Sequence, residues 1–308
     1  MGWGTICAVS ESGVPRLVRS RHEGDQSYLH RLAHAHLPPE IADRWLALLR
    51  PAIRLQKAAA GELVLARLGG RPYLPEGVDW PVWEERGPMA YVGEIDLQAV
   101  AHSGLEFHGR LPDRGRLLFF HFDGWYGLQD TPENYLDANP FEGPGTDGAR
   151  LLHVAEARQD CVERPAPEGV NEENLREQAG RQITTFPNRW EPRHGAEFSA
   201  LGWEHPVNAD PFDEALFQMT GPTHTQIGGW AHPERTPVEY AVAHRTFSDG
   251  RGIYLNPHTC EFDPDILAEA DHWSLLLQVD LDPFTLYWLN RRGGQEPLDT
   301  VSFDYQCF

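Results

Sequence analysis

Glu94 and Asp96 stand two positions apart in a stretch whose residues alternate as in a β-strand. Alternate strand residues share a face, and paired carboxylates can transfer protons or bind a cation. Each can instead serve the fold, because Asp96 could cap a following helix and Glu94 could bind an arginine or the backbone. A second copy of the pattern has Gln278 and Asp280. Since glutamine does not titrate, a hydrogen-bonding role explains both copies, and we expect no catalytic residue here.

Histidines are the second group that could do chemistry. His30 and His34 share one face of a predicted helix, with His36 close by, and such a pair can bind a metal. No glutamate follows the first histidine as in the H-E-x-x-H motif. We therefore expect an exposed helix face and no metal ion.

The remaining candidate binding residues lie near two glycine-rich turns. Trp80 follows the first turn and Trp230 the second. Tryptophan is enriched at binding hot spots, although it can also pin a loop onto the core. His224 precedes the second turn and could converge with Asp271, His272 and Asp280. The candidate binding residues are Trp80, Glu94, Asp96, His224, Trp230, Gln278 and Asp280.

The sequence gives little support for nucleotide binding or for a site built on cysteine thiols. Residues 143–148 match G-x-G-x-x-G, but Pro144 interrupts them and no clear strand precedes them. A dinucleotide site needs a strand, the turn and then a helix. The four cysteines form no C-x-x-C pair. We expect no cofactor.

Two glycine-rich turns must position these candidates. Each is followed by an apolar strand ending in hydrophobic-Asp-Leu and then by an aromatic strand. Glycine takes a positive φ freely and proline stiffens an extended loop. The residues expected to shape the turns are Gly69, Gly70, Pro72, Pro75, Pro81, Gly228 and Gly229.

The two occurrences of this order predict a duplicated unit, at about 63–155 and 223–308, with a polar insertion between. The alternative is a chance likeness within an apolar chain. We expect an α+β fold of mostly antiparallel sheets in two related halves, with peripheral helices. Residues 1–57 would form an N-terminal tail and helical segment, and 58–308 a single domain.

Periodicity assigns the individual elements. It predicts strands at 63–68, 91–97, 115–122, 150–154, 273–281, 284–289 and 301–308. It predicts helices within 26–57, near 172–178 and at 213–219. Residues 123–149 and the rest of 160–211 are expected to be loops, because they are rich in Gly, Pro and polar residues.

Several segments resemble the DUF1963, or YwqG-like, family. The matching segments are 68–75, 80–81, 93–97, 227–229, 277–280 and 305–308, within a likeness over about 50–308. Glu94 departs from the glutamine usual in the family, and residues 282–284 replace a glycine-bearing turn. The resemblance implies a mixed α+β fold with mostly antiparallel sheet. It implies no established activity and supplies no catalytic residues.

Charge limits the partners. The chain carries 26 basic and 46 acidic residues, for a formal net charge of −20. Phosphates and anionic lipids repel such a surface, so we expect no nucleic-acid or membrane binding. The sequence has neither a signal-peptide pattern nor a membrane-length apolar run, which predicts a cytoplasmic protein. Its single lysine, Lys57, beside many arginines suggests a GC-rich bacterial source.

Three functions remain open. The first is a non-enzymatic binding protein, such as an inhibitor or immunity-type partner of a basic protein. The second is a hydrolase-type enzyme with carboxylate and histidine groups in a cleft between the halves. The third is a small-ligand or carbohydrate binder that uses the loop tryptophans. The sequence does not decide the oligomeric state.

Overall fold

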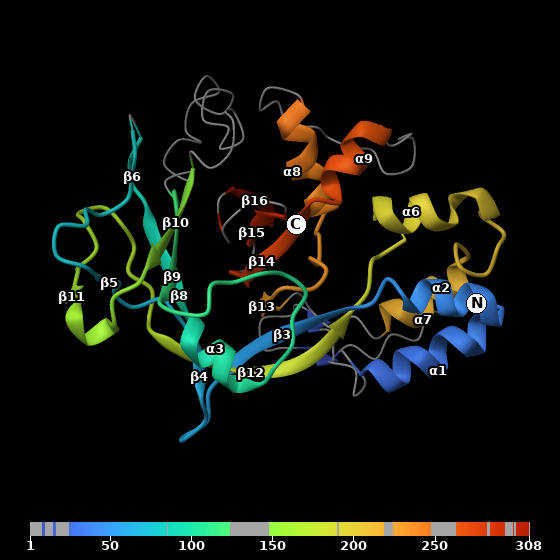
Figure 1. Ribbon diagram of the computed structural model, residues 1–308, viewed down its shortest axis with the longest axis horizontal. Helices are drawn as coiled ribbons and strands as arrows, with labels where there is room; N and C mark the ends of the chain where they lie inside the picture. Colours follow the sequence, from blue (N-terminus) through green and yellow to red (C-terminus); the bar gives the residue numbers. More distant parts are fainter. Residues whose placement is uncertain are drawn as a thin grey trace.

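The computed structural model describes residues 8–9, 15–16, 25–84, 86–123, 148–189, 191–218, 224–247, 263–281, 284–292, 298 and 300–307. Within these ranges the chain has an α+β fold built on one ten-stranded antiparallel sheet (Figure 1). The sheet is nearly closed, because its two ends curl toward each other. Phe119 from one end and Trp288 from the other have ring centroids 5.1 Å apart.

The large sheet has the spatial order β10 (Ala149–Val154), β9 (Arg116–His121), β8 (Ala90–Asp96), β4 (Val64–Leu68), β12 (Arg176–Thr185), β3 (Arg50–Lys57), β13 (Gln226–Ile227), β14 (Trp273–Asp280), β15 (Phe284–Arg291) and β16 (Val301–Cys307). Three two-stranded sheets join β1 (Ala8–Val9) to β2 (Pro15–Arg16), β5 (Tyr73–Leu74) to β11 (Val162–Glu163), and β6 (Val82–Trp83) to β7 (Gly87–Pro88).

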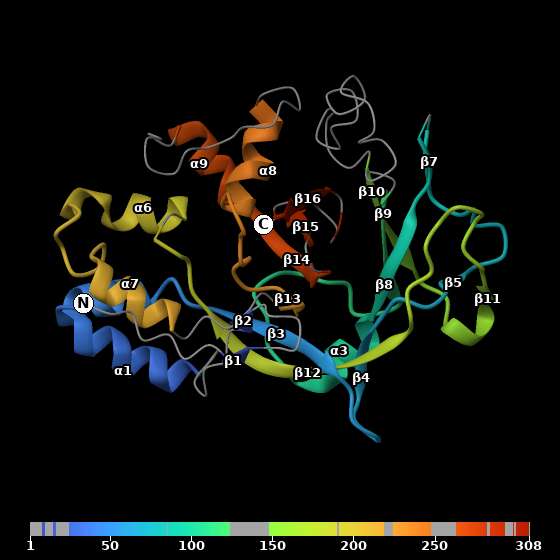
Figure 2. The ribbon, with the colours of Figure 1, turned by 180° about the vertical axis from the view of Figure 1, so that it is seen from behind.

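The helices form separate layers around this sheet. They are α1 (Gln26–His36), α2 (Pro39–Leu46), α3 (Leu97–Ser103), α6 (Pro192–Phe198), α7 (Asp210–Phe217), α8 (Val238–Phe247) and α9 (Pro264–Ala270), with the short 3-10 helices η1 (Arg158–Asp160) and η2 (Ser199–Leu201). Helices α1, α2, α6 and α7 gather at one end of the molecule, and α8 and α9 lie beside β14–β16 (Figures 1 and 2).

The apolar strands are buried on both faces, which explains their continuous hydrophobic runs. In β15, Leu286 and Trp288 point into the core inside the curled sheet. Tyr287 and Leu289 point the other way and pack with residues of α8 and α9. The outer helices therefore cover this end of the sheet.

The strand order is symmetric about the central pair of β12 and β3. The first strand set (β4, β8, β9, β10) runs outward from β12, and the second strand set (β13, β14, β15, β16) runs outward from β3. Gly69 N–H donates to Val92 O at 2.9 Å, and Gly228 N–H donates to Leu276 O at 3.2 Å. These hydrogen bonds occupy matching places in the two sets. The origin of the sets by duplication stays a prediction.

Three secondary-structure expectations are wrong. The helical period of 26–57 ends early, since residues 50–57 form β3 in the middle of the sheet. The expected helix at 172–178 is absent, because β12 begins at Arg176. The loop expected over the rest of 160–211 is wrong as well, since this segment contains most of β12 and the whole of α6. Strand β12 was not predicted because its sequence is polar, since only a few of its residues face the core. One of them is Gly180, where a Cβ atom would lie 2.4 Å from Leu65 Cδ1.

The expected loop at 123–149 lies almost wholly outside the described residues, which omit 124–147. The predicted helix at 213–219 agrees in part with α7. Among the described residues, no helix is long and apolar enough to span a membrane.

Candidate functional site

The structure places Glu94 and Asp96 in roles that serve the fold. Asp96 caps α3, and its carboxylate accepts a hydrogen bond from Ala99 N at 2.9 Å. Glu94 is buried and accepts hydrogen bonds from Arg116 Nη1 at 2.8 Å and from Arg158 Nη1 at 2.7 Å. Arg67 adds a third guanidinium, with Nη1 3.5 Å from Glu94 Oε1.

Gln278, Asp280 and His224 do come together, where β13 meets β14. The buried Gln278 donates to His224 O at 2.8 Å and accepts from His232 N at 2.8 Å. Asp280 N–H donates to Thr225 Oγ1 at 3.3 Å. The Gln278 amide thus ties the chain before the second glycine turn to the chain after it.

Both predicted tryptophans anchor loops. Trp80 Nε1 donates to Met89 O at 2.8 Å, and its ring packs edge-on against Phe120. Trp230 is buried, and its Nε1 donates to Leu48 O at 2.7 Å. The two side chains lie in different parts of the molecule, Trp80 beside the first strand set and Trp230 beside β3 and β13.

The four glycines of the two turns have left-handed backbone conformations. The φ angles are 68° at Gly69, 72° at Gly70, 67° at Gly228 and 78° at Gly229. Backbone groups of the proline loop are also engaged: Pro72 O accepts from Arg164 N, Pro75 O from Val78 N, and Pro81 O from Met89 N.

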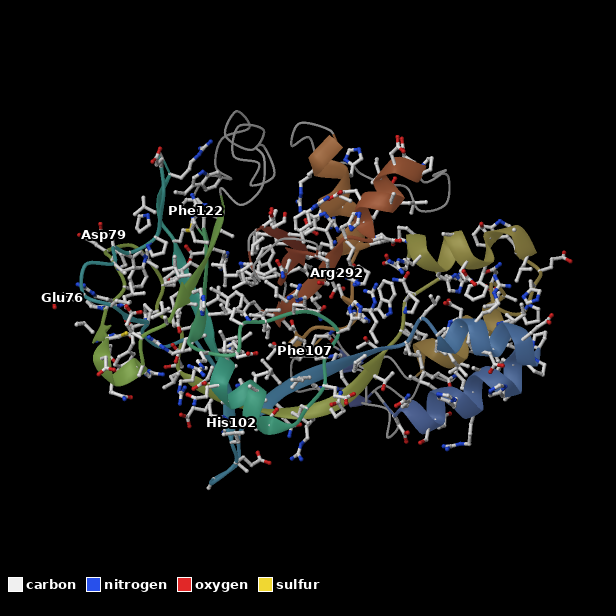
Figure 3. The ribbon with its side chains drawn as sticks, in the orientation of Figure 1. Glu76, Asp79, His102, Phe107, Phe122 and Arg292 are labelled. Atoms are coloured by element: carbon white, nitrogen blue, oxygen red, sulfur yellow. The ribbon has the colours of Figure 1, made fainter. Side chains whose placement is uncertain are left out.

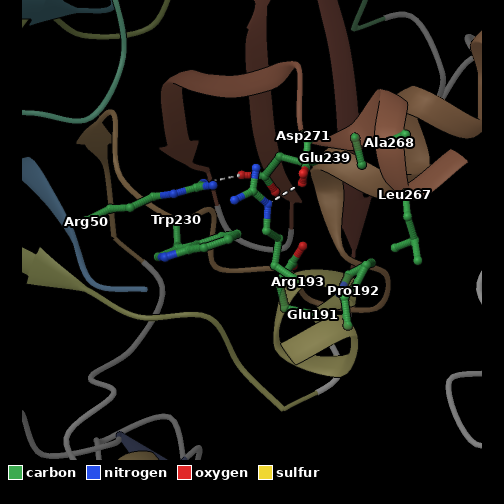
Figure 4. A pocket seen from close by; sticks show the side chains of 11 residues that line it. Arg50, Glu191, Pro192, Arg193, Trp230, Glu239, Leu267, Ala268 and Asp271 are labelled. Atoms are coloured by element: carbon green, nitrogen blue, oxygen red, sulfur yellow. Dashed lines mark hydrogen bonds and ion pairs between the residues drawn. The ribbon is translucent and has the colours of Figure 1, made fainter. Parts of the chain in front are cut away.

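Trp230 also lines a pocket of about 110 Å³ (Figure 4). We call it the Arg50–Trp230 pocket. Its lining comes from β3, from α6 and its N-cap, from the turn after β13, from α8, and from α9 and its C-cap. The lining residues are Arg50, Glu191, Pro192, Arg193, Ala196, Trp230, Glu239, Leu267, Ala268, Ala270 and Asp271.

Arg50 forms the inner wall. Its guanidinium carbon lies 3.2 Å from the ring centroid of Trp230, and Nη1 lies 3.5 Å from Glu239 Oε1. A cation over an indole face is held by the ring quadrupole. Burial lowers the pKa of Arg50 to about 10, so the side chain is still charged at neutral pH.

Two buried carboxyl groups face this arginine. Glu191, the N-cap of α6, is 5% exposed, and Glu239 on α8 is 3% exposed. Burial raises the pKa of both, and the charge of Glu239 raises the pKa of Glu191 further. Arg50 opposes the rise at each of them. Glu191 therefore keeps its proton to a higher pH than an ordinary glutamate does.

The two carboxyl groups differ in their partners. Glu239 has the ion pair with Arg50, whereas the Glu191 carboxyl forms no hydrogen bond or ion pair with any described residue. Figure 4 shows the Glu191 side chain within the pocket, with dashed contacts drawn only for Arg50–Glu239 and Arg193–Asp271.

Other basic residues lie around the pocket. Arg193 pairs with Asp271 at the rim, where their side chains are 37% and 47% exposed. Arg292 lies near the centre of the molecule, between the large sheet and α6 (Figure 3). His108 is close as well, and burial followed by the charge of Arg50 lowers its pKa to about 3, so it is neutral.

This arrangement can bind a small polar molecule, and two carboxyl groups in unequal surroundings can also act as an acid and a base. Of the candidate binding residues only Trp230 lines the pocket, and Asp271, a candidate neighbour of His224 in the sequence analysis, lies at its rim. Sequence reasoning missed Arg50, Glu191 and Glu239, because they come from three distant segments without a shared motif. Among the described residues, no three His, Cys, Asp or Glu side chains group as a metal site.

The fold and site define an α+β protein with a nearly closed antiparallel sheet and a charged pocket beside it. The family model of DUF1963, a domain of unknown function, matches residues 66–290. The chain therefore belongs to the DUF1963 family. A comparison with curated proteins finds no match.

Proposed function

We propose that this protein binds a small molecule in the Arg50–Trp230 pocket. The Glu191 carboxyl carries the proposal: it is buried, opens into the pocket and has no partner among the described residues. Buried polar groups are nearly always hydrogen-bonded, since an unmade bond costs about 1–3 kcal/mol. A bound ligand would supply the missing partner.

The form of the pocket supports this function. Charged groups converge from β3, α6, α8 and α9 beside a tryptophan and an apolar wall of Pro192 and Leu267. Ligand sites combine an apolar lining with a few placed polar groups in this way. An apolar cavity of about 150 Å³ holds benzene, so a pocket of about 110 Å³ suits a ligand of a few heavy atoms.

A thermal-shift screen tests the proposal with small anions, cations and neutral polar compounds. A ligand present at about 100 times its Kd stabilises the folded state by about 2.7 kcal/mol, which raises Tm by several degrees. Ala196 is exposed at the pocket wall, so Ala196→Phe should block the pocket and abolish the shift.

Ala101→Phe, at an exposed position of α3 away from the pocket, is the matched control and should keep the shift. A panel without any compound that stabilises the protein would contradict the proposal. Shifts that persist unchanged in Ala196→Phe would contradict it too, because they would place the ligand elsewhere.

Binding of a basic protein is the second candidate function, and the net charge of −20 favours it. Two large side chains, Trp203 and Phe217, are 69% and 65% exposed and could contribute contacts. A pull-down from the host lysate at low and high salt tests it. A stoichiometric basic protein that dissociates at high salt supports it, and an empty low-salt eluate contradicts it.

A further inference from the structure

Building on the proposed function, we propose that the ligand of the Arg50–Trp230 pocket is a small carboxylate anion, held by the Arg193 guanidinium and the Glu191 carboxyl group. Four observations carry this: the charges around the pocket, the exchangeable pair at its rim, its size and apolar wall, and the unpartnered Glu191.

The charge balance favours an anion. Arg50 is paired with Glu239, and Arg193 with Asp271. Arg292 is near enough to lower the pKa of Arg50, yet among the described residues it forms no ion pair, and its buried Nε has no hydrogen-bond partner. When Glu191 holds its proton, the two arginines and two carboxylates of the lining balance, and Arg292 adds one positive charge close to the pocket. A cationic ligand would meet the guanidinium groups of Arg50 and Arg193 and gain little from two carboxylates that are already paired.

The rim pair can exchange for a ligand. The Arg193 and Asp271 side chains are about two-fifths exposed, and ion pairs at such positions contribute little to stability. Breaking the ion pair between Arg193 and Asp271 therefore costs little free energy. The planar guanidinium group of Arg193 can then bind the carboxylate of a ligand through two parallel hydrogen bonds.

The size and apolar wall limit the rest of the ligand. The pocket holds a few heavy atoms, and Pro192, Leu267 and Ala268 form its apolar side. A short aliphatic tail can lie there while the carboxylate faces Arg193. Propionate has this form, and ethylammonium has nearly the same size with the opposite charge.

Glu191 supplies a hydrogen-bond donor to the anion. The charged groups that face it are Arg50 from β3, Arg193 from α6, Glu239 from α8 and Asp271 after α9. Its protonated carboxyl group can donate to one oxygen of the ligand, and the ionised form would instead repel that oxygen. Binding therefore retains a proton on Glu191, and the affinity for the anion falls as the pH rises.

Isothermal titration calorimetry with propionate and with ethylammonium, between pH 6 and pH 8, tests the proposal. We expect propionate to bind, more weakly at higher pH, and ethylammonium not to bind. Glu191→Gln keeps a neutral donor, so its affinity should depend less on pH than that of the wild type. Arg193→Gln should weaken binding by about ten-fold or more, through loss of a charge-assisted hydrogen bond. Arg181→Gln, an exposed arginine paired with Glu62, should bind as the wild type does.

The outcomes separate this inference from the proposed function. In one outcome, cations or neutral compounds stabilise the protein, Ala196→Phe abolishes this effect, and propionate does not bind. The pocket would then still be a ligand site, but its assignment to carboxylates would be overturned. An absence of any ligand in the whole panel would overturn both. Propionate binding that Arg193→Gln leaves unchanged would overturn the inference alone. Because the Arg193 side chain is 37% exposed, this variant should fold.

Discussion

Glu94 and Gln278 occupy matching places in the two strand sets. Both side chains are polar and buried, and different partners satisfy them. Glu94 pairs in register with Arg67 of β4, and Gln278 with Gln226 of β13. The carboxylate is balanced by three guanidinium groups, whereas the amide donates to one backbone carbonyl and accepts from one backbone N–H. At both places a polar side chain links the strand to a neighbouring segment, as the sequence comparison of the two copies predicts.

Glu191 has a raised pKa in the folded state, and this predicts how stability changes with pH. The folded protein binds the proton more tightly than the unfolded chain, so the free energy of unfolding falls as pH rises above the unfolded pKa of about 4.3. The loss is complete once the pH exceeds the folded pKa. Glu191→Gln removes this dependence and should become increasingly more stable than the wild type between pH 4.5 and pH 8.

Urea unfolding of both proteins across this pH range measures the difference. Glu76→Gln, at an exposed glutamate outside the pocket, is the control and should follow the wild type. A Glu191→Gln protein whose stability stays parallel to that of the wild type would contradict a raised pKa at Glu191.

At the scale of elements, the second glycine turn positions the pocket. Gly229 has a φ of 78°, and a Cβ atom there would lie 2.6 Å from Ala52 Cβ on β3. The turn can approach β3 this closely only because glycine has no side chain. Trp230 follows directly, and its N–H donates to Thr185 Oγ1 at 2.8 Å. The indole is thereby placed against Arg50.

Gly229→Ala should therefore lower the free energy of unfolding by more than the cost of placing alanine in a left-handed backbone conformation. Gly61 has a φ of 82°, and a Cβ atom added there would meet nothing within 4 Å, so Gly61→Ala reports the backbone cost, about 1–2 kcal/mol. We expect Gly229→Ala to exceed that loss in urea unfolding and to weaken ligand binding as Trp230 shifts. Equal losses in the two variants would contradict close packing at Gly229.

The individual strands and turns show how much of the fold can be predicted from the sequence. The apolar strands and the cap at Asp96 follow from local patterns, and the structure contains them. The glycines of the two turns have positive φ angles, as their sequence context favours. Strands β3 and β12 could not be predicted from local patterns. In β3 the apolar spacing continued a helical period by coincidence, and β12 is too polar to resemble a central strand. The pocket could not be foreseen for a related reason: its charged residues meet only once these two strands have brought distant segments together.

The molecule as a whole carries a strong negative charge. With a net charge of −20, repulsion between carboxylates on one compact body opposes folding, and dissolved salt screens it. The screening length falls from about 30 Å at 0.01 M to about 8 Å at 0.15 M salt. We expect Tm to rise when NaCl is increased over this range.

A matched series in KCl separates general screening from binding of a particular cation, and both salts should raise Tm alike. A fall in Tm with added salt would mean that the arginine–carboxylate pairs, which the same ions weaken, outweigh the repulsion.

The central position of β3 has a consequence for the order in which the chain can fold. The first strand set can form from neighbouring segments, but β3 must wait for strands made much later. The hydrogen bond from Thr185 Oγ1 to Arg50 O joins residues 135 positions apart, and β13, its other neighbour, follows later still. During synthesis β3 would leave the ribosome with both edges unpaired, and an unpaired strand edge is prone to association with other chains. The early helices α1 and α2, which directly precede it, are the only described helices available at that time to shield it.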